Sequence, residues 1–370
     1  MTPKNVDSLM EQFLKWMRSV DGGHKTARDG KQKVRQIVAV LKMASPDDNI
    51  NALFNHKTVR DLWLTPYSGR DDIEPGTVKN YCGTLKLFFK FLMCEKPKEV
   101  VFSQEEAQSM IATTSNWQAS FKGKAQIQHF RKQLKDLKKK LAPKDILAFD
   151  KSDYAVKTRG TIRRRKNAAS PPSAREFTTA RDFIITSLIL GNAIRPGVIH
   201  GITLREFKDG GGGNGDHIVY VMDHKTKKTS GPRAVVFPSE LYDLTIIYIH
   251  RIRNLLSDMG HKNDDKVFTS LTGNRMSSSL VNGQWTACFE KATGWCIPTN
   301  ATIVRKSFVS YAHKNHGDTE TKRNLANMMC HSEKTAASSY FLEDKAENVA
   351  KTFNFMKKAF KSSATITKRY

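Results

Sequence analysis

Four short motifs in the second half of the chain contain residues capable of chemistry on a phosphate diester. Cleaving such an ester without a metal requires a nucleophile, positive charge beside the non-bridging oxygens and an acid for the leaving oxygen. Arg195 lies between two expected helices, exposed at its base and surrounded by apolar packing, and this position suits it to binding a phosphate. In chain order, the motifs are 191–197 with Arg195, 224–226 with Lys225, 302–308 with Arg305, and 325–341 with His331 and Tyr340.

Each of these residues, taken alone, has an ordinary structural interpretation. A tyrosine such as Tyr340 is more often a half-buried packing residue, Arg195 a cation at a helix end, and His331 the neighbour of an N-cap. The order in which the motifs occur favours a shared function over these separate interpretations.

The order of the motifs resembles the tyrosine recombinase (phage-integrase-type) superfamily. That family arranges its site as Arg, Lys, His-x-x-Arg, His or Trp, then Tyr, with the Tyr nine residues after the last His; here Tyr340 follows His331 by nine. The resemblance covers residues 173 to about 360 by motif, and the N-terminal part by architecture alone. The segment HSEKTAASSYF and the Lys-rich helix after it look closest to eukaryotic mobile-element recombinases such as Cryptons.

The resemblance implies a site-specific recombinase or transposase that cuts and rejoins DNA without a metal or other cofactor. Tyr340 is then the nucleophile that forms a 3′-phosphotyrosyl intermediate, and Lys225 protonates the leaving 5′ oxygen. Arg195 and Arg305 carry planar guanidinium groups suited to bidentate contact with the non-bridging oxygens, and His331 donates a further hydrogen bond to the phosphate.

Two positions depart from the pattern of the family. Thr302 stands where the family has the His of His-x-x-Arg, and Val198 stands where an acidic residue is common. Threonine can hydrogen-bond a phosphate but cannot carry a proton at neutral pH. Two alternatives therefore stay open: a domesticated DNA-binding protein that keeps the fold with weak or no catalysis, and an activity like that of type IB topoisomerases.

The charge of the chain predicts double-stranded DNA as its partner. Sixty-one Lys and Arg against 36 Asp and Glu leave a net charge of +25, and a basic surface gains affinity by displacing counterions from phosphates. Residues 121–170 hold 16 Lys and Arg and 4 Asp, a net of +12. Candidate DNA contacts are Lys132, Lys135 and Lys139 on a basic helix, Arg163, Arg164 and Arg165 in a stretch ending at Pro171-Pro172, and Lys228 in a basic turn.

Apolar spacing predicts a mainly α protein with a small β-hairpin. A helical core-binding, or DNA-clamp, domain is expected over residues 1–120, with one helix face made by Val6, Leu9, Met10, Phe13 and Met17. A second helix is expected from Thr26 to Met43, and a third after Pro75 with Thr77 as its N-cap.

The remaining segments are expected to be a basic helix and interdomain linker over 121–172, an α+β catalytic domain over 173–342, and a C-terminal helix or tail over 343–370. Ser173 and Glu176 have capping-box spacing, and two strands are expected at about 217–222 and 234–237. The resemblance also implies a synaptic tetramer on DNA, in which the apolar stripe of the tail packs on a neighbouring copy.

The location of the protein is expected to be the nucleus if its source is eukaryotic, and otherwise the cytoplasm, in either case on DNA. The basic run 163–166 could serve as a nuclear localisation signal. No signal peptide is recognised at the N-terminus, and the longest apolar stretch is too short to span a bilayer, so no membrane partner is expected.

Overall fold

The computed structural model describes residues 3–213, 215–224, 227, 231–253, 265–315, 318–329, 332–341 and 349–357. The chain divides into two compact units, Met1–Lys132 and Gln133–Tyr370. The domain boundary expected at residue 120 falls inside helix α6 (Gln104–Leu137), because no proline interrupts the helical sequence there. In the described part of the chain, no helix is long and apolar enough to cross a membrane.

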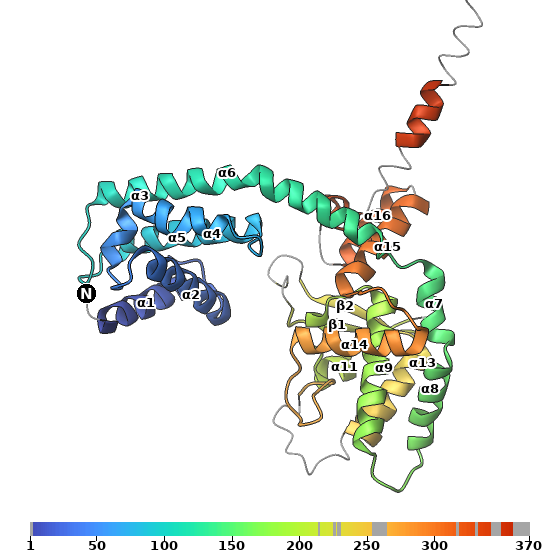
Figure 1. The fold of residues 1–370 in the computed structure, drawn as a ribbon. Helices are drawn as coiled ribbons and strands as arrows, with labels where there is room; N and C mark the ends of the chain where they lie inside the picture. Colours follow the sequence, from blue (N-terminus) through green and yellow to red (C-terminus); the bar gives the residue numbers. More distant parts are fainter. Residues whose placement is uncertain are drawn as a thin grey trace, which may run out of the picture. The chain divides into compact units, whose positions relative to one another are not determined.

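The N-terminal unit is entirely helical among its described residues (Figure 1). Its elements before α6 are α1 (Pro3–Arg18), α2 (Ala27–Ala44), η1 (Ile50–Phe54), α3 (His56–Thr58), η2 (Val59–Leu64), α4 (Thr65–Ser68) and α5 (Pro75–Glu95).

The helices of this unit begin and pack largely as the sequence predicts. The predicted apolar face of α1 is buried, and the Thr26 side chain caps α2 by accepting a hydrogen bond from the Asp29 amide. The predicted cap of the third helix is wrong. α5 starts two residues before Thr77, with Glu74 as N-cap, because the fixed φ of Pro75 suits the first helical position.

An aromatic cluster fills the core of the N-terminal unit. The ring of Phe13 on α1 meets Phe88 of α5 edge-on at 5.2 Å between centroids, and Phe91 lies 5.3 Å from it. The Thr84 hydroxyl donates to the Gln36 side chain at 2.6 Å, which satisfies a buried polar pair between α5 and α2.

The C-terminal unit combines helices with one two-stranded antiparallel sheet, so the predicted fold class is confirmed. Its first elements are α7 (Pro143–Lys151), α8 (Asp153–Arg165), α9 (Ala174–Asn192), α10 (Pro196–Ile199), α11 (Leu204–Asp209), β1 (His217–Val221) and β2 (Arg233–Phe237). The later elements are α13 (Ser239–Ile247), η3 (Tyr248–Arg253), α14 (Ser278–Thr293), α15 (Ala301–Asn315), α16 (Thr319–Met328), α17 (Glu333–Thr335), η5 (Ala336–Tyr340) and a helix over 349–357.

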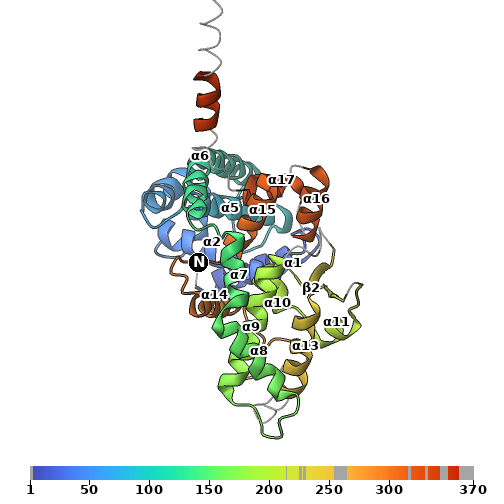
Figure 2. The ribbon, with the colours of Figure 1, turned by 90° about the vertical axis from the view of Figure 1, so that its right-hand side faces the viewer.

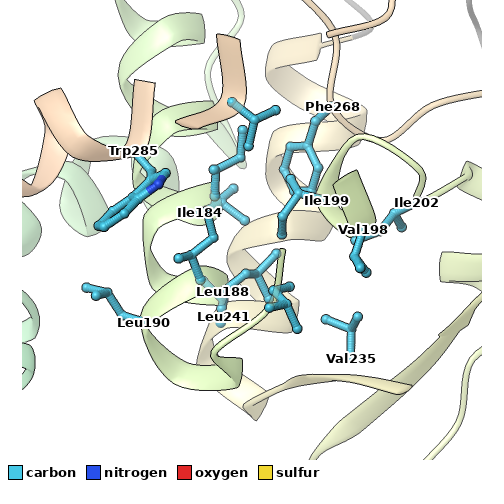
Figure 3. Close-up of a cluster of buried hydrophobic side chains, with 14 of the residues drawn as sticks. Ile184, Leu188, Leu190, Val198, Ile199, Ile202, Val235, Leu241, Phe268 and Trp285 are labelled. Atoms are coloured by element: carbon cyan, nitrogen blue, oxygen red, sulfur yellow. The ribbon is translucent and has the colours of Figure 1, made fainter. Parts of the chain in front are cut away.

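Helix α9 is the central element of this unit. Ser173 and Glu176 form the predicted capping box at its start, and it packs against α8, α13, α14 and β2 (Figures 1 and 2). Ile184 and Leu188 of α9 lie in a cluster with Trp285 of α14 and Phe268 (Figure 3). Burying this much apolar surface fixes the residue that follows the helix, which matters for the site below.

The strands confirm the predicted hairpin. His217 pairs with Phe237 and Val221 with Arg233, so the register places the connecting turn after Val221. The stretch predicted as an interdomain linker differs from expectation. Much of it forms α8, because Ala155, Thr158 and Ile162 recur at helical spacing and are buried against the unit's core.

A buried ion pair holds the start of this unit to α15. The Lys306 ammonium donates to the Asp136 carboxylate at 2.6 Å, and both residues are less than a tenth exposed. The Ser307 hydroxyl accepts a hydrogen bond from the Leu141 amide at 2.9 Å. Lys306, the neighbour of Arg305 in the sequence, therefore holds α15 in place.

We expect Asp136→Asn to destabilise the protein by about 3 to 5 kcal/mol, because it leaves the Lys306 charge buried without its counter-ion. Chemical denaturation measures this change. The double variant Asp136→Leu with Lys306→Met removes both charges and should recover most of the loss. The control Asp209→Asn breaks an exposed pair with Arg205 and should cost at most about 0.5 kcal/mol. Equal losses for Asp136→Asn and this control would contradict the assigned role.

Candidate active site

Arg195 projects from the connection between α9 and α10. Helix α9 ends at Asn192, and its C-cap Ala193 adopts a left-handed conformation with φ of 47°; Ala193 and Ile194 are fully buried. Asn192 exchanges two hydrogen bonds of 2.8 Å with the Val236 backbone on β2, and Arg195 itself is the N-cap of α10. The backbone of Arg195 is therefore anchored on both sides while its side chain extends outward.

Arg305 is supplied by the second turn of α15. The Asn300 side chain starts this helix by accepting hydrogen bonds from the Thr302 and Ile303 amides. Arg305 is 2% exposed, and its guanidinium donates to the Met329 carbonyl oxygen at 3.2 Å. A buried guanidinium with a fixed orientation can bind an anion without reorganising.

Tyr340 lies at the end of η5 between these two arginines. The Arg195 guanidinium donates to the Tyr340 hydroxyl at 3.1 Å, and the centre of the Arg305 guanidinium lies 4.7 Å from the centroid of the Tyr340 ring. The neighbouring Phe341 stacks on His313 at 4.8 Å between ring centroids, which fixes the end of the η5 segment to α15. Residues 145 apart in sequence thus meet in one contact.

The electrostatics of the site favour ionisation of this phenol. Burial acts to raise the pKa of Tyr340, but the charges of Arg305 and Arg195 and their hydrogen bonds outweigh it, and the pKa lies below its usual value. Tyr154 and Tyr248 show the opposite effect, because burial raises the pKa of both. Among these three tyrosines, Tyr340 is the one whose pKa is lowered.

A cavity of about 230 Å³ opens beside the two arginines. It is several times the volume of one water molecule, about 30 Å³, and can hold a phosphodiester group. Thr302, which stands at the position of the family's histidine, lines this cavity, and so does Val198. The full lining is Arg195, Pro196, Gly197, Val198, His224, Ser278, Ala301, Thr302 and Arg305.

A polar network lies next to this cavity. The Arg275 guanidinium donates to the Asp223 carboxylate at 2.8 Å and to His200 Nδ1 at 3.3 Å, so His200 Nε2 is the protonated nitrogen and donates to Ser278 Oγ at 3.1 Å. Burial and then Arg275 lower the pKa of His200, which keeps the ring neutral near pH 7. Asp223 also pairs with Lys227 at 3.0 Å.

The structure thus brings together Arg195, Arg305, Tyr340 and Thr302 from the predicted set. Lys225, Lys228 and His331 lie outside the described residues. The sequence did not indicate that Ser278, Arg275 and His224 lie in or beside the cavity. The position of His224 directly before Lys225 could have indicated that it lies near the site. Nothing in the sequence around Ser278 or Arg275 indicates the same for those residues.

The predicted DNA contacts fall into two groups. Lys132, Lys135 and Arg164 are exposed, and Lys139 is half-buried. Arg163 forms an ion pair with Glu240, and Arg165 forms one with Glu176. The Arg165–Glu176 pair is largely buried and joins the end of α8 to the start of α9, whereas the Arg163–Glu240 pair is exposed and adds little stability.

Comparison with known proteins relates this geometry to one class of fold. No protein-family model matches the sequence, and no curated protein matches it. The XerH site-specific recombinase bound to difH substrate, in a pre-cleavage complex, has a TM-score of 0.50 and 14% identity, covering 94% of this chain and 95% of that one. A post-cleavage complex of XerH with palindromic difH has a TM-score of 0.48 and 14% identity, covering 95% and 97%. A lambda integrase dimer bound to a COC′ core site has a TM-score of 0.47 and 12% identity, covering 92% and 96%.

This chain has the fold of the tyrosine recombinases. The fold expected from the motif order is confirmed, while membership of the superfamily and the relation to Crypton-like recombinases stay predictions.

The lowered pKa of Tyr340 is directly measurable. In an ultraviolet titration of wild type minus Tyr340→Phe, we expect one phenol to ionise below the usual tyrosine pKa of about 10. Arg195→Gln removes one of the causes and should move that ionisation to higher pH. The matched variant Arg275→Gln removes a guanidinium that contacts His200 and should leave it in place. A difference titration unaffected by Arg195→Gln would contradict the electrostatic account.

Proposed function

We propose that this protein is a site-specific DNA recombinase or transposase that cuts and rejoins DNA through a covalent bond to Tyr340. The observation that carries the proposal is the hydrogen bond of 3.1 Å from Arg195 to the Tyr340 hydroxyl, with Arg305 against the same ring. Two cations and a nucleophile at one point are what transfer of a phosphodiester requires.

The first step is attack by the Tyr340 oxygen on phosphorus. A bond forms between the phenol oxygen and phosphorus, and the bond from phosphorus to the 5′ oxygen breaks, which leaves DNA attached through a 3′-phosphotyrosyl ester. Arg195 and Arg305 stabilise the charge that develops on the non-bridging oxygens as the phosphate occupies the cavity that both of them line. Because the arginines supply the positive charge, this scheme uses no metal.

Two further residues complete the proposed reaction on the strength of the family resemblance. Lys225 gives a proton to the leaving 5′ oxygen, and His331 donates a hydrogen bond to the phosphate. Rejoining is the reverse reaction, in which a 5′ hydroxyl attacks the phosphotyrosine, so the energy of the broken ester is kept in the covalent intermediate.

Double-stranded DNA is the proposed partner. The net charge of +25 supports this proposal. The proposed DNA contacts include the exposed Lys132, Lys135 and Arg164, together with Lys139 and Lys228. Arg163 and Arg165 stay in the predicted set, and each of them also pairs with a carboxylate, Glu240 and Glu176 respectively. Import into the nucleus by the run 163–166 stays a prediction for a eukaryotic source.

Incubation with nicked duplexes made from the DNA on either side of the gene should trap a protein–DNA adduct that survives denaturation, because a nick lets the short 5′ strand diffuse away. Tyr340→Phe should abolish the adduct, since it lacks the attacking oxygen. Tyr311→Phe removes an exposed hydroxyl from α15 and is the matched control. Equal adduct from wild type and Tyr340→Phe would exclude the proposed nucleophile.

One observation favours a second candidate. Thr302 lines the cavity where the family places an imidazole, which is compatible with a domesticated DNA-binding protein that has lost catalysis. Salt-dependent DNA binding without adduct on any nicked duplex would support that candidate. Relaxation of supercoiled plasmids of arbitrary sequence would instead indicate activity like that of a type IB topoisomerase.

A synaptic tetramer is the proposed assembly. In the helix over 349–357, Val349, Phe353 and Met356 share one face and are exposed, as a segment that packs on a neighbouring copy requires. The other members of the predicted stripe, Ala346 and Phe360, lie outside the described residues.

Phe353→Asp should weaken assembly on DNA, because it places a charge in the apolar stripe. The control Asn354→Asp adds the same charge on a different face and should assemble normally. Light scattering of each full-length protein with a nicked duplex measures the mass of the complex. If Phe353→Asp and wild type give the same mass, the stripe does not join the copies.

A further inference from the structure

We propose that Ser278 is an additional catalytic residue, whose hydroxyl donates a hydrogen bond to a non-bridging oxygen of the phosphate that is cleaved. The inference rests on the proposed function and deepens it, because it adds an uncharged phosphate ligand that none of the sequence motifs contains. Ser278 lines the same cavity as Arg195 and Arg305, so a phosphate held there by the two arginines faces its hydroxyl.

A further donor is needed because part of each guanidinium is already engaged by the protein. One amino group of Arg195 donates to the Tyr340 hydroxyl, and one amino group of Arg305 donates to the Met329 carbonyl oxygen. Negative charge on the non-bridging oxygens grows during the transfer, and every fixed donor aimed at them lowers the energy of that state. A hydroxyl adds such a donor without adding another charge to the site.

Ser278 lies beside the loop that supplies Arg195 because α10 packs on α14. Ser278 is the first residue of α14, and α10 directly follows Arg195. A Cβ placed on Gly197, two residues after Arg195, would lie 3.5 Å from Ser278 Oγ and 3.9 Å from His200 Nε2. Both distances are ordinary van der Waals contacts, so the hydroxyl lies directly against this loop.

The start of α14 does not use the Ser278 hydroxyl. The N-cap of this helix is Ser277, whose side chain accepts a hydrogen bond from the Leu280 amide. Ser278 Oγ lies 3.1 Å from His200 Nε2, and in the part of the chain that the structure describes this is its one hydrogen bond. The hydroxyl therefore serves the cavity and not the helix.

The direction of that hydrogen bond leaves the Ser278 proton for the substrate. A guanidinium can only donate, so His200 Nδ1 accepts from Arg275 at 3.3 Å. The proton of the neutral ring is then on Nε2, which donates to Ser278 Oγ. Ser278 is exposed, so a phosphate oxygen in the cavity replaces water as the acceptor for its O–H.

These donors form a chain that runs in one direction toward the cavity. Asp223 accepts from Arg275 at 2.8 Å, and this hydrogen bond is the largest cause that lowers the pKa of Asp223 to about 2. Arg275 donates to His200, His200 to Ser278, and Ser278 to the phosphate. Linked donors polarise one another, which strengthens the last hydrogen bond of the chain. His200 is thus a positioning residue that acts through Ser278.

Thr302 carries the second hydroxyl of the cavity but is not oriented in this way. Among the described residues its side chain has no hydrogen-bond partner. Ordering such a side chain on a phosphate costs conformational entropy, whereas the contact with His200 already holds Ser278 Oγ in place. Ser278 is therefore the better phosphate ligand of the two.

The rate of adduct formation on nicked duplexes from the DNA flanking the gene tests the proposal. Ser278→Ala removes the donor and should react about 10- to 100-fold more slowly, as for the loss of a hydrogen bond to a charged group. Ser278→Thr keeps a hydroxyl and should retain most of the rate. Ser279→Ala is the matched control, because Ser279 is the next residue of the same helix, is exposed and does not line the cavity. It should react like wild type.

A phosphorothioate at the cleaved position identifies which phosphate Ser278 contacts. Sulfur accepts hydrogen bonds more weakly than oxygen, so one of the two diastereomers should slow wild type. Ser278→Ala has no such hydrogen bond to lose, and the same diastereomer should slow it less. If both diastereomers slow Ser278→Ala as much as they slow wild type, the hydroxyl does not bind the cleaved phosphate and the proposal is wrong.

A double variant separates the positioning role of His200 from a general effect on the fold. His200→Ala should slow wild type about 10-fold and should not slow Ser278→Ala further, because the chain of donors is already broken there. Equal slowing in both backgrounds would contradict the positioning role, and a wild-type rate for Ser278→Ala would overturn the whole proposal. Failure of the proposed function itself looks different, since wild type then forms no adduct.

Discussion

Two guanidinium groups converge on one phenol, and this convergence is the constraint on which the rest of the C-terminal unit depends. Like charges repel, and burying either one removes it from water, so neither arginine would stay beside Tyr340 without support from the fold. The contact of Arg195 with the phenol oxygen at 3.1 Å and the position of Arg305 over the ring are therefore results of packing elsewhere.

That support comes from elements with no chemistry of their own. The buried face of α9 fixes Ala193 and Ile194, which immediately precede Arg195. The Asp136–Lys306 pair and the Leu141–Ser307 hydrogen bond hold α15, which carries Arg305. A rigid scaffold of this kind lets the charges act on a phosphate without the cost of reorganising around it.

The cavity is lined by an imidazole although the histidine expected at position 302 is a threonine. With Thr302 in place of a histidine, the cavity still contains an imidazole, supplied by His224 from the β-hairpin. The two positions lie far apart in sequence and face one space.

The sequence by itself determined the features that depend on local spacing. Short-range pattern and residue chemistry predict the helical face of α1, the start of α2 near Thr26, the Ser173 capping box, the hairpin strands and the order Arg195, Arg305, Tyr340. Local pattern did not decide whether a long basic segment is exposed to solvent or packed against the core. The sequence predicts a basic linker for the stretch that contains Arg163 and Arg165. In the structure this stretch is part of a helix, Ile162 on it is buried, and the two arginines pair with glutamates.

Only the tertiary structure decided which residues share the site. Contacts across 145 residues, as between Arg195 and Tyr340, depend on how α9, α15 and η5 pack together, and no local spacing encodes that geometry. For the same reason the sequence did not indicate that Ser278 and Arg275, which have no motif around them, lie at this site. Motif order names candidates because chemistry restricts residue type, whereas distance and burial arise from the whole fold.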